Sequence, residues 1–165
     1  MNSTETQIVP VTESISIQRY KDQVLDASFV DNVLKDVIDK TKTFTVINGK
    51  KHVKVEGWET LGAMMRCTSE VVLIKEYKNG YWSEAIIKDA TGTQLSKGIG
   101  ICLRDESNWK NKDDYAILSM AQTRSIGKAY RLAFSWIMSM AGYEPCPAEE
   151  MEQPQKQPEN KFVKK

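Results

Sequence analysis

Three cations in the last third of the chain have the spacing of a phosphate-binding surface. Arg124, Lys128 and Arg131 fall within roughly 60° of one another when the segment around them is drawn as an α-helix. No acidic residue lies between Asp114 and Glu144, so none of the three cations has a carboxylate partner one helical turn away. Unpaired cations beside small side chains suit the backbone of a nucleic acid, and a merely solvated helix face is the competing interpretation.

Four further cations could extend this surface. Lys97 lies in a predicted strand, and the loop RDESNWKNK, which leads into the long helix, carries the other three. Trp109 in this loop could stack on a base or cover the end of the sheet. Lysines on sheets often serve only solubility and edge protection, which is the alternative for each of them. We expect the nucleic-acid-binding residues to be Arg124, Lys128, Arg131, Lys97, Arg104, Lys110 and Lys112.

Residues suited to catalysis are sparse. His52 stands between lysines with no serine or cysteine near it in sequence, and the chain has no glycine-rich phosphate loop. The acidic pairs Asp105-Glu106 and Asp113-Asp114 could hold a metal ion as in a nuclease, but capping and solvation explain them more simply. The three cysteines have no C-x-x-C spacing, which indicates reduced thiols and no zinc site. We expect no enzymatic activity, no cofactor and no metal.

The cationic residues belong to the longest helical pattern in the chain, residues 113–142. Asp113 and Asp114 can accept hydrogen bonds from free N–H groups at its start, and Gly142 suits the left-handed position after its end. Phe134 and Met138 lie near the cationic side, which predicts burial against a neighbouring subunit. The opposite side collects apolar residues, namely Tyr115, Leu118, Ala129, Ala133, Trp136, Ile137 and Met140.

The preceding residues predict a helix, a hairpin and a second, short helix. Apolar residues recur at helical spacing over 22–40. Residues 43–47 and 51–55 are β-rich runs around Asn48-Gly49-Lys50, a strong signal for a tight turn. A short helix over 57–65 follows, and its Trp58 is interpreted as a core residue rather than a base-stacking platform.

Three strands in series are predicted next, over residues 69–78, 81–89 and 93–104, as an antiparallel meander. Gly98 and Gly100 are unfavourable inside the last of these strands. They therefore predict a bulge, a sharp bend or another backbone lying close to the strand. The predicted class is α+β, with an antiparallel sheet of hairpin and meander packed on the long C-terminal helix.

Length and composition fit one domain with tails. The chain has 165 residues, 41% of them hydrophobic, and a formal net charge of +1, which neither supports nor excludes nucleic-acid binding. We predict an N-terminal arm over 1–18, a folded domain over 19–145 and a disordered, proline-rich tail over 146–165. The polar N-terminus and the lack of long apolar runs favour a cytoplasmic protein without a signal peptide or membrane span.

The order of hairpin, short helix, meander and long basic helix resembles the Rad52 family of single-strand annealing proteins and their phage relatives. Lys128-Ala129-Tyr130-Arg131 looks like the family's K-R-A-L-R segment, with Gly127 where a further cation is common. Gly98-Ile99-Gly100 resembles the G-x-G of the preceding strand, and Val55-Glu56-Gly57-Trp58 resembles the turn after the first hairpin. The similarity spans about residues 43–143. Gly127 removes one expected phosphate contact, for which we expect Arg124 to compensate.

This resemblance implies a Rad52-like core that binds and anneals single-stranded DNA without ATP, in recombination or repair. It implies a homo-oligomeric ring or filament, with DNA in a groove between the sheet and the long helix. A partner exonuclease or single-strand-binding protein would be a further partner, and the setting would be a bacterial or phage-infected cell. Two alternatives remain open: a module that binds RNA or reads the shape of double-stranded RNA, and a phage or plasmid assembly protein that binds no nucleic acid.

Overall fold

The computed structural model describes residues 30–151. Residues 30–41 form a helix, the described part of the one predicted over 22–40. The arm over 1–18 and the tail beyond residue 151 lie outside the described residues. The remaining elements are, in order, β1 (Phe44–Ile47), β2 (Lys50–Val53), α2 (Val55–Met64), β3 (Thr68–Tyr77), β4 (Gly80–Lys88), β5 (Gln94–Leu103), α3 (Asp114–Met140) and the 3-10 turn η1 (Ala148–Glu150).

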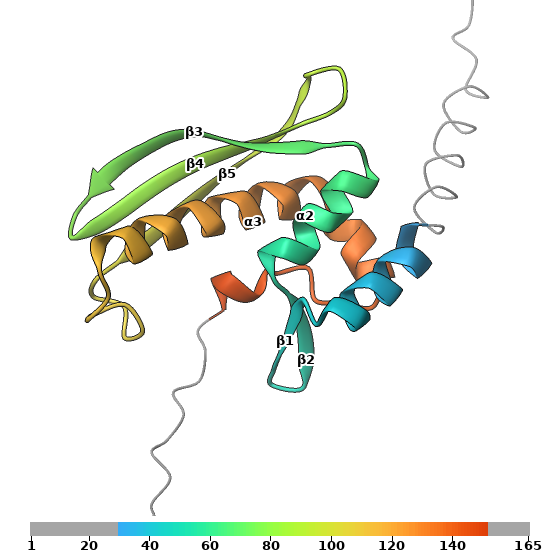
Figure 1. Ribbon diagram of the computed structural model, residues 1–165, viewed down its shortest axis with the longest axis horizontal. Coiled ribbons are helices and arrows are strands. Elements are labelled where there is room, and N and C mark those ends of the chain that lie inside the picture. Colours follow the sequence, from blue (N-terminus) through green and yellow to red (C-terminus); the bar gives the residue numbers. More distant parts are fainter. Residues whose placement is uncertain (1–29, 152–165) are drawn as a thin grey trace, which may run out of the picture.

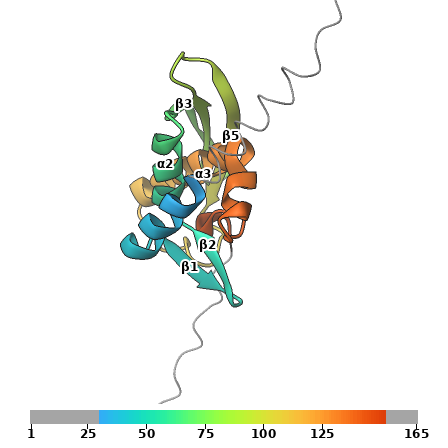
Figure 2. The same cartoon turned by 90° about the vertical axis from the view of Figure 1, so that its right-hand side faces the viewer.

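The α+β class is confirmed, but the strands form two separate sheets rather than one. β1 and β2 make a two-stranded antiparallel hairpin, and β3, β4 and β5 make a three-stranded antiparallel meander. The hairpin projects from the molecule on the side away from the meander (Figures 1 and 2). Its turn is formed by Asn48 and Gly49, both with positive φ, as the sequence predicts.

α3 lies along one face of the meander, and small side chains let it approach closely (Figure 1). A Cβ atom added to Gly98 would collide with the backbone of Ser125 and Ala129, and one added to Gly100 would collide with the backbone of Ala121 and Ser125. Of the three explanations that the sequence left open for these two glycines, the structure shows the third, another backbone lying close to the strand. The helix backbone is seated directly on β5, which fixes the position of every α3 side chain relative to that strand.

The other side of α3 is also covered, which corrects the predicted faces of this helix. Phe134 is 6% exposed and Met138 is fully buried, both in the chain's own core. They pack there with Trp58, confirmed as a core residue, and with residues of the helix over 30–41. The expected burial of Phe134 and Met138 against a second subunit is therefore wrong. Conversely, Tyr115, Trp136 and Met140 of the predicted apolar face are exposed.

The ends of α3 match the prediction only in part. Gly142 has a φ of 78° just after the helix, as expected. Asp113 occupies the N-cap position, but its side chain makes no capping hydrogen bond. Asp114 pairs with Arg104 instead. The helix start is thus joined to the preceding loop by an ion pair, because the arginine lies within reach across the loop.

The packed part of the chain extends beyond the predicted end at residue 145. Residues 143–151, called the C-terminal strap below, run back across the molecule after α3. The Glu144 N–H donates to the Lys51 carbonyl at 3.0 Å, and Pro147 and Ala148 are buried. The prediction of a disordered tail from residue 146 is therefore wrong for residues 146–151. Pro147 lies against Gly127 of α3, a contact that composition alone does not reveal.

Candidate nucleic-acid interface

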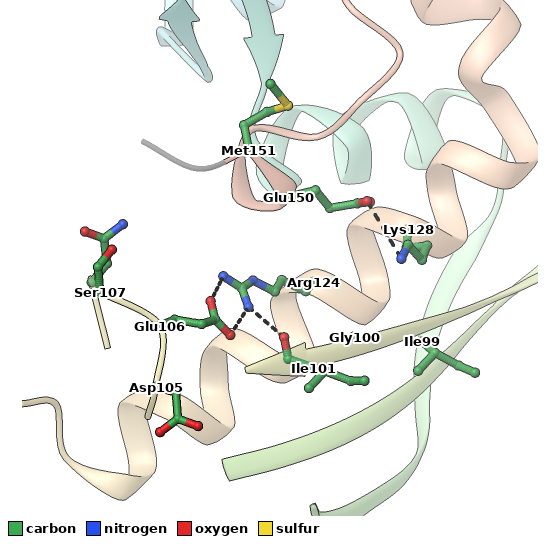
Figure 3. Close-up of a pocket in the computed structure, with 11 residues that line it drawn as sticks. Ile99, Gly100, Ile101, Asp105, Glu106, Ser107, Arg124, Lys128, Glu150 and Met151 are labelled. Carbon is green, nitrogen blue, oxygen red and sulfur yellow. Dashed lines mark hydrogen bonds and ion pairs between the residues drawn. The ribbon is translucent and has the colours of Figure 1, made fainter. Parts of the chain in front are cut away.

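An open cavity of about 590 Å³ lies between β5, α3, the loop after β5 and the C-terminal strap. Arg124 and Lys128 reach it from α3, Ile99 to Ile101 line it from β5, and Glu106 and Glu150 line it from the loop and the strap (Figure 3). Two of the three predicted cations of α3 therefore share one cavity. Arg131 lines a separate depression of about 250 Å³, together with Leu132 and Cys146.

Arg124 is held in a fixed position by protein groups. Its guanidinium forms a two-pronged pair with the Glu106 carboxylate, with N···O distances of 2.8 and 2.6 Å. It also donates to the Ile101 carbonyl at 2.6 Å and to the Glu149 carbonyl at 3.2 Å. Such bidentate pairs are among the stronger ion pairs in proteins. Arg124 therefore joins β5, α3, the loop and the strap, in addition to facing the cavity.

The Glu106 carboxyl shows the electrostatic effect of this pairing. Burial by itself raises its pKa, but hydrogen bonds from Arg124 and from the Leu103 N–H outweigh burial and bring the pKa below its usual value. A carboxyl with a lowered pKa in the folded state stabilises the fold when it is ionised. This contribution is complete above the unfolded pKa, near 4.5, and is lost as the pH falls through the lower folded value.

We predict that Glu106→Gln lowers the stability at pH 7 and weakens its dependence on acid. The amide cannot accept both guanidinium hydrogen bonds, and a half-buried cation is left without its counter-charge. The expected loss is about 1 to 3 kcal/mol in urea unfolding at pH 7. The wild type and the variant should converge as the pH falls well below 4.5. Glu70→Gln, which breaks an exposed pair with Lys88, is the control and should cost about 1 kcal/mol or less. Equal effects of the two substitutions at pH 7 would contradict the role of Glu106.

Lys128 and Arg131 are also paired, although neither has a partner within their helix. The Glu150 carboxylate lies 3.0 Å from an Arg131 guanidinium nitrogen and 3.8 Å from the Lys128 ammonium. No acidic residue lies one turn away within the helix, as the sequence shows. The inference that the three cations are unpaired is nevertheless wrong. The partner of Arg124 comes from the loop after β5, and the shared partner of Lys128 and Arg131 comes from the strap. Both cations keep partly exposed side chains, at 37% for Lys128 and 30% for Arg131.

Trp109 covers the end of the sheet and also borders a second cavity. It is half-buried and packs against a small cluster of Cys102, Ile117 and Ala121. A cavity of about 310 Å³ lies beside it and is also lined by Met120 and Arg124. Trp109 thus covers the end of the sheet, which was the alternative to base stacking. It also borders a cavity that Arg124 lines.

Lys97 and Arg104 are not brought together with the cations of α3. Lys97 alternates with Gly98 along β5, so it projects from the sheet face opposite α3, where it pairs with Glu84. Arg104 pairs with Asp114 and donates to the Lys112 carbonyl at 3.0 Å. It lines a small depression of about 180 Å³ beside the β3–β4 turn. The predicted binding set is therefore divided over different surfaces.

Lys110 and Lys112 are exposed in the loop before α3. Their side chains form no ion pair within residues 30–151. The acidic residues of the same loop are engaged, because Asp105 accepts from the Asn79 amide and Glu106 pairs with Arg124. Over the described range, no three His, Cys, Asp or Glu side chains are grouped so that they could hold a metal ion.

Sequence reasoning offers Glu84 and Glu106 as possible carboxylate partners of the three cations, and in the structure Glu106 pairs with Arg124. Glu150 was missed as a residue that shapes the cavity, because it lies in the segment predicted to be disordered. The available signal was weak, since Ala148-Glu149-Glu150 follows a proline and can form a single helical turn. Pairing over such sequence separations depends on the fold and leaves no periodic pattern.

Comparisons of the chain with protein-family models, with curated proteins and with solved structures give no match. Within residues 30–151, the longest helix is too polar to cross a lipid bilayer.

Proposed function

We propose that the protein binds single-stranded DNA and anneals complementary strands without ATP, as a Rad52-like recombination or repair protein. The observation that carries the proposal is the shared cavity of Arg124 and Lys128 between β5 and α3, with Arg131 one turn further along the helix. An open groove with cations along one wall suits an extended phosphate chain. Lys110 and Lys112 are free to contribute from the neighbouring loop.

The proposed mechanism uses electrostatic contacts without reading the sequence. Lys128 and Arg131 neutralise backbone phosphates, and the release of counterions drives binding. Arg124 presents a guanidinium that the Glu106 carboxylate and the Ile101 carbonyl hold in one orientation. With the backbone held along the groove, the bases remain available to pair with a second strand. No step in this scheme needs nucleotide hydrolysis.

The direct test combines a gel shift with an annealing assay. Purified protein should retard a labelled single-stranded oligonucleotide and accelerate its pairing with the complementary strand in buffer that contains no ATP. Duplex DNA and RNA of the same sequence belong in the same experiment, because stronger binding to RNA would support the alternative of an RNA-binding module. Failure to bind any of the three nucleic acids would support the assembly-protein alternative and overturn the proposal.

The surface proposed for self-association differs from the one expected from the sequence. Leu132, Trp136 and Met140 are exposed by 60%, 44% and 41%, and they lie four residues apart along α3. Residues at this spacing form one apolar stripe on the helix surface. We propose that this stripe contacts a second copy of the chain in a ring or filament. Apolar residues in such a row are costly to leave in water.

We predict that Trp136→Glu converts the oligomer into smaller species. A charge placed in the centre of an apolar interface, with loss of the indole contact, should weaken association by at least about 30-fold. Light scattering coupled to size-exclusion chromatography measures the change. Tyr115→Glu is the control, because Tyr115 is 71% exposed near the other end of α3. A wild-type protein that stays monomeric at micromolar concentration, with and without DNA, would remove the ring from the proposal.

A further inference from the structure

The first half of the C-terminal strap is held by the hairpin and by Gly127 of α3, and one Arg131 guanidinium nitrogen also lies 3.7 Å from the Cys146 sulfur. Glu144 forms a parallel bridge with His52 of β2, and the Glu144 N–H donates to the Lys51 carbonyl at 3.0 Å. The His52 Nδ1 lies 3.1 Å from the Cys146 carbonyl oxygen. Pro147 is buried over Gly127, where an added Cβ would approach the proline ring to 3.3 Å. The hairpin and α3 thus hold the strap in place up to Pro147.

The second half of the strap lies on the proposed DNA site. Glu150 places a carboxylate oxygen 3.0 Å from Arg131 and 3.8 Å from Lys128. Its side chain is only 14% exposed, so the carboxylate is enclosed between the strap and the helix (Figure 3). A carboxylate and a phosphate make the same kind of charge-assisted hydrogen bonds to these cations. Glu150 therefore occupies the position that a backbone phosphate would take.

The second half of the strap contains buried polar atoms that lack hydrogen-bond partners among the described residues. One oxygen of Glu149 and one oxygen of Glu150 are buried without a hydrogen-bond partner among the described residues. Burial raises the pKa of the Glu149 carboxyl, which shows that its charged form is held unfavourably. Buried polar groups without partners oppose the closed arrangement. The Val55 N–H donates to the other Glu149 oxygen at 3.1 Å and Arg124 donates to the Glu149 carbonyl at 3.2 Å, so residue 149 keeps two anchors. The Glu150 side chain itself is held by its ion pairs with Arg131 and Lys128.

We propose that residues 149–151 act as a built-in competitor for nucleic acid, in which Glu150 blocks Lys128 and Arg131 until a DNA phosphate replaces its carboxylate. This inference rests on the proposed function, because it assigns a regulatory contact to the same cations. Binding exchanges one anion for another at these cations, while Pro147 and the first half of the strap stay in place. The contact lowers the affinity for weak or short anionic ligands and is overcome by a continuous phosphate chain.

The test is the affinity of the full chain for a single-stranded oligonucleotide, measured for the wild type and for Glu150→Gln. The amide keeps the size of the side chain but removes its charge, so the affinity should rise about fivefold, the effect of losing one ion pair with partly exposed cations. Glu144→Gln is the matched control. It makes the same charge change within the strap, but its partner is Lys50 of the hairpin, at 3.1 Å. Its affinity should stay within about twofold of the wild type.

A triple variant, compared with the double variant of the two cations, shows whether the gain acts through those cations. If Glu150 competes at Lys128 and Arg131, Glu150→Gln should give no gain in an Arg131→Gln, Lys128→Gln background. Hydrogen exchange adds a direct reading: DNA should increase exchange at residues 149–151 and leave the Glu144 amide protected. Equal affinities of Glu150→Gln and Glu144→Gln, in a protein that binds DNA, would overturn the competitor and leave the proposed function standing. If the wild type and Glu150→Gln both fail to bind, both proposals are wrong.

Discussion

Gly100→Ala should destabilise the protein by about 1 to 3 kcal/mol, the usual cost of forcing extra volume into a packed site. The added methyl group would meet the backbone of Ala121 and Ser125, and neither can move without shifting α3. Such a shift would also strain the buried contact between the Ser83 and Ser125 hydroxyls, which lie 3.0 Å apart. In thermal unfolding the midpoint should fall by roughly 2 to 12 °C for a chain of this size.

The neighbouring Ile99 provides the control for this substitution. Its side chain is 41% exposed on the opposite face of β5, away from α3. Ile99→Ala removes a larger group from the same strand but should cost about 1 kcal/mol or less. If Gly100→Ala melts within about 1 °C of the wild type, close contact with β5 is not what positions α3. The position of Arg124, which donates a hydrogen bond to the Ile101 carbonyl, would then need another explanation.

Replacing both Lys128 and Arg131 by glutamine should weaken single-stranded DNA binding about 25-fold at 0.1 M salt. Each phosphate contact to a single strand contributes about 0.7 to the salt slope of the binding constant. At this ionic strength one lost contact corresponds to about fivefold, and two independent contacts multiply. The salt slope should fall by about 1.4 for every sequence alike, because backbone contacts carry no sequence information.

The free energy of unfolding distinguishes a lost phosphate contact from a general loss of structure. Both side chains are partly exposed and share one carboxylate, so the double variant should unfold within about 1 kcal/mol of the wild type. Lys35→Gln combined with Lys40→Gln is the charge-matched control, since it also removes two cations, from pairs with Asp31 and Asp36 on the helix over 30–41. It should leave the salt slope unchanged. A folded double variant with wild-type affinity and slope would show that these cations are not the DNA site.

Arg124 is expected to behave differently from its two neighbours. The sequence places all three on one helix face and predicts that exposed cations can be removed at little cost. The structure gives Arg124 four hydrogen bonds to protein groups, so its removal would leave Glu106 without its partner. Loss of DNA binding in an Arg124 variant would therefore mix two effects. Lys128 and Arg131 are the better positions at which to test binding.

Features that depend on near neighbours in the chain were determined by the sequence itself. The Asn48-Gly49 turn, the meander and the long helix follow from turn residues and from period-two and helical spacing, which act over a few residues. The sequence also indicated that Gly98 and Gly100 need a special environment, because glycine is unfavourable inside a strand, but only the structure decided between a bulge, a bend and a closely packed backbone.

The tertiary structure alone decided which partners the cations have and which faces of α3 are covered. Glu106 and Glu150 reach α3 from a loop and a strap, at separations for which no local pattern exists. Phe134 and Met138 are buried because α2 and the helix over 30–41 cover a second side of α3, an arrangement that helical spacing cannot specify. Charge pairing and burial depend on which segments meet in space, whereas sequence periodicity describes one segment at a time.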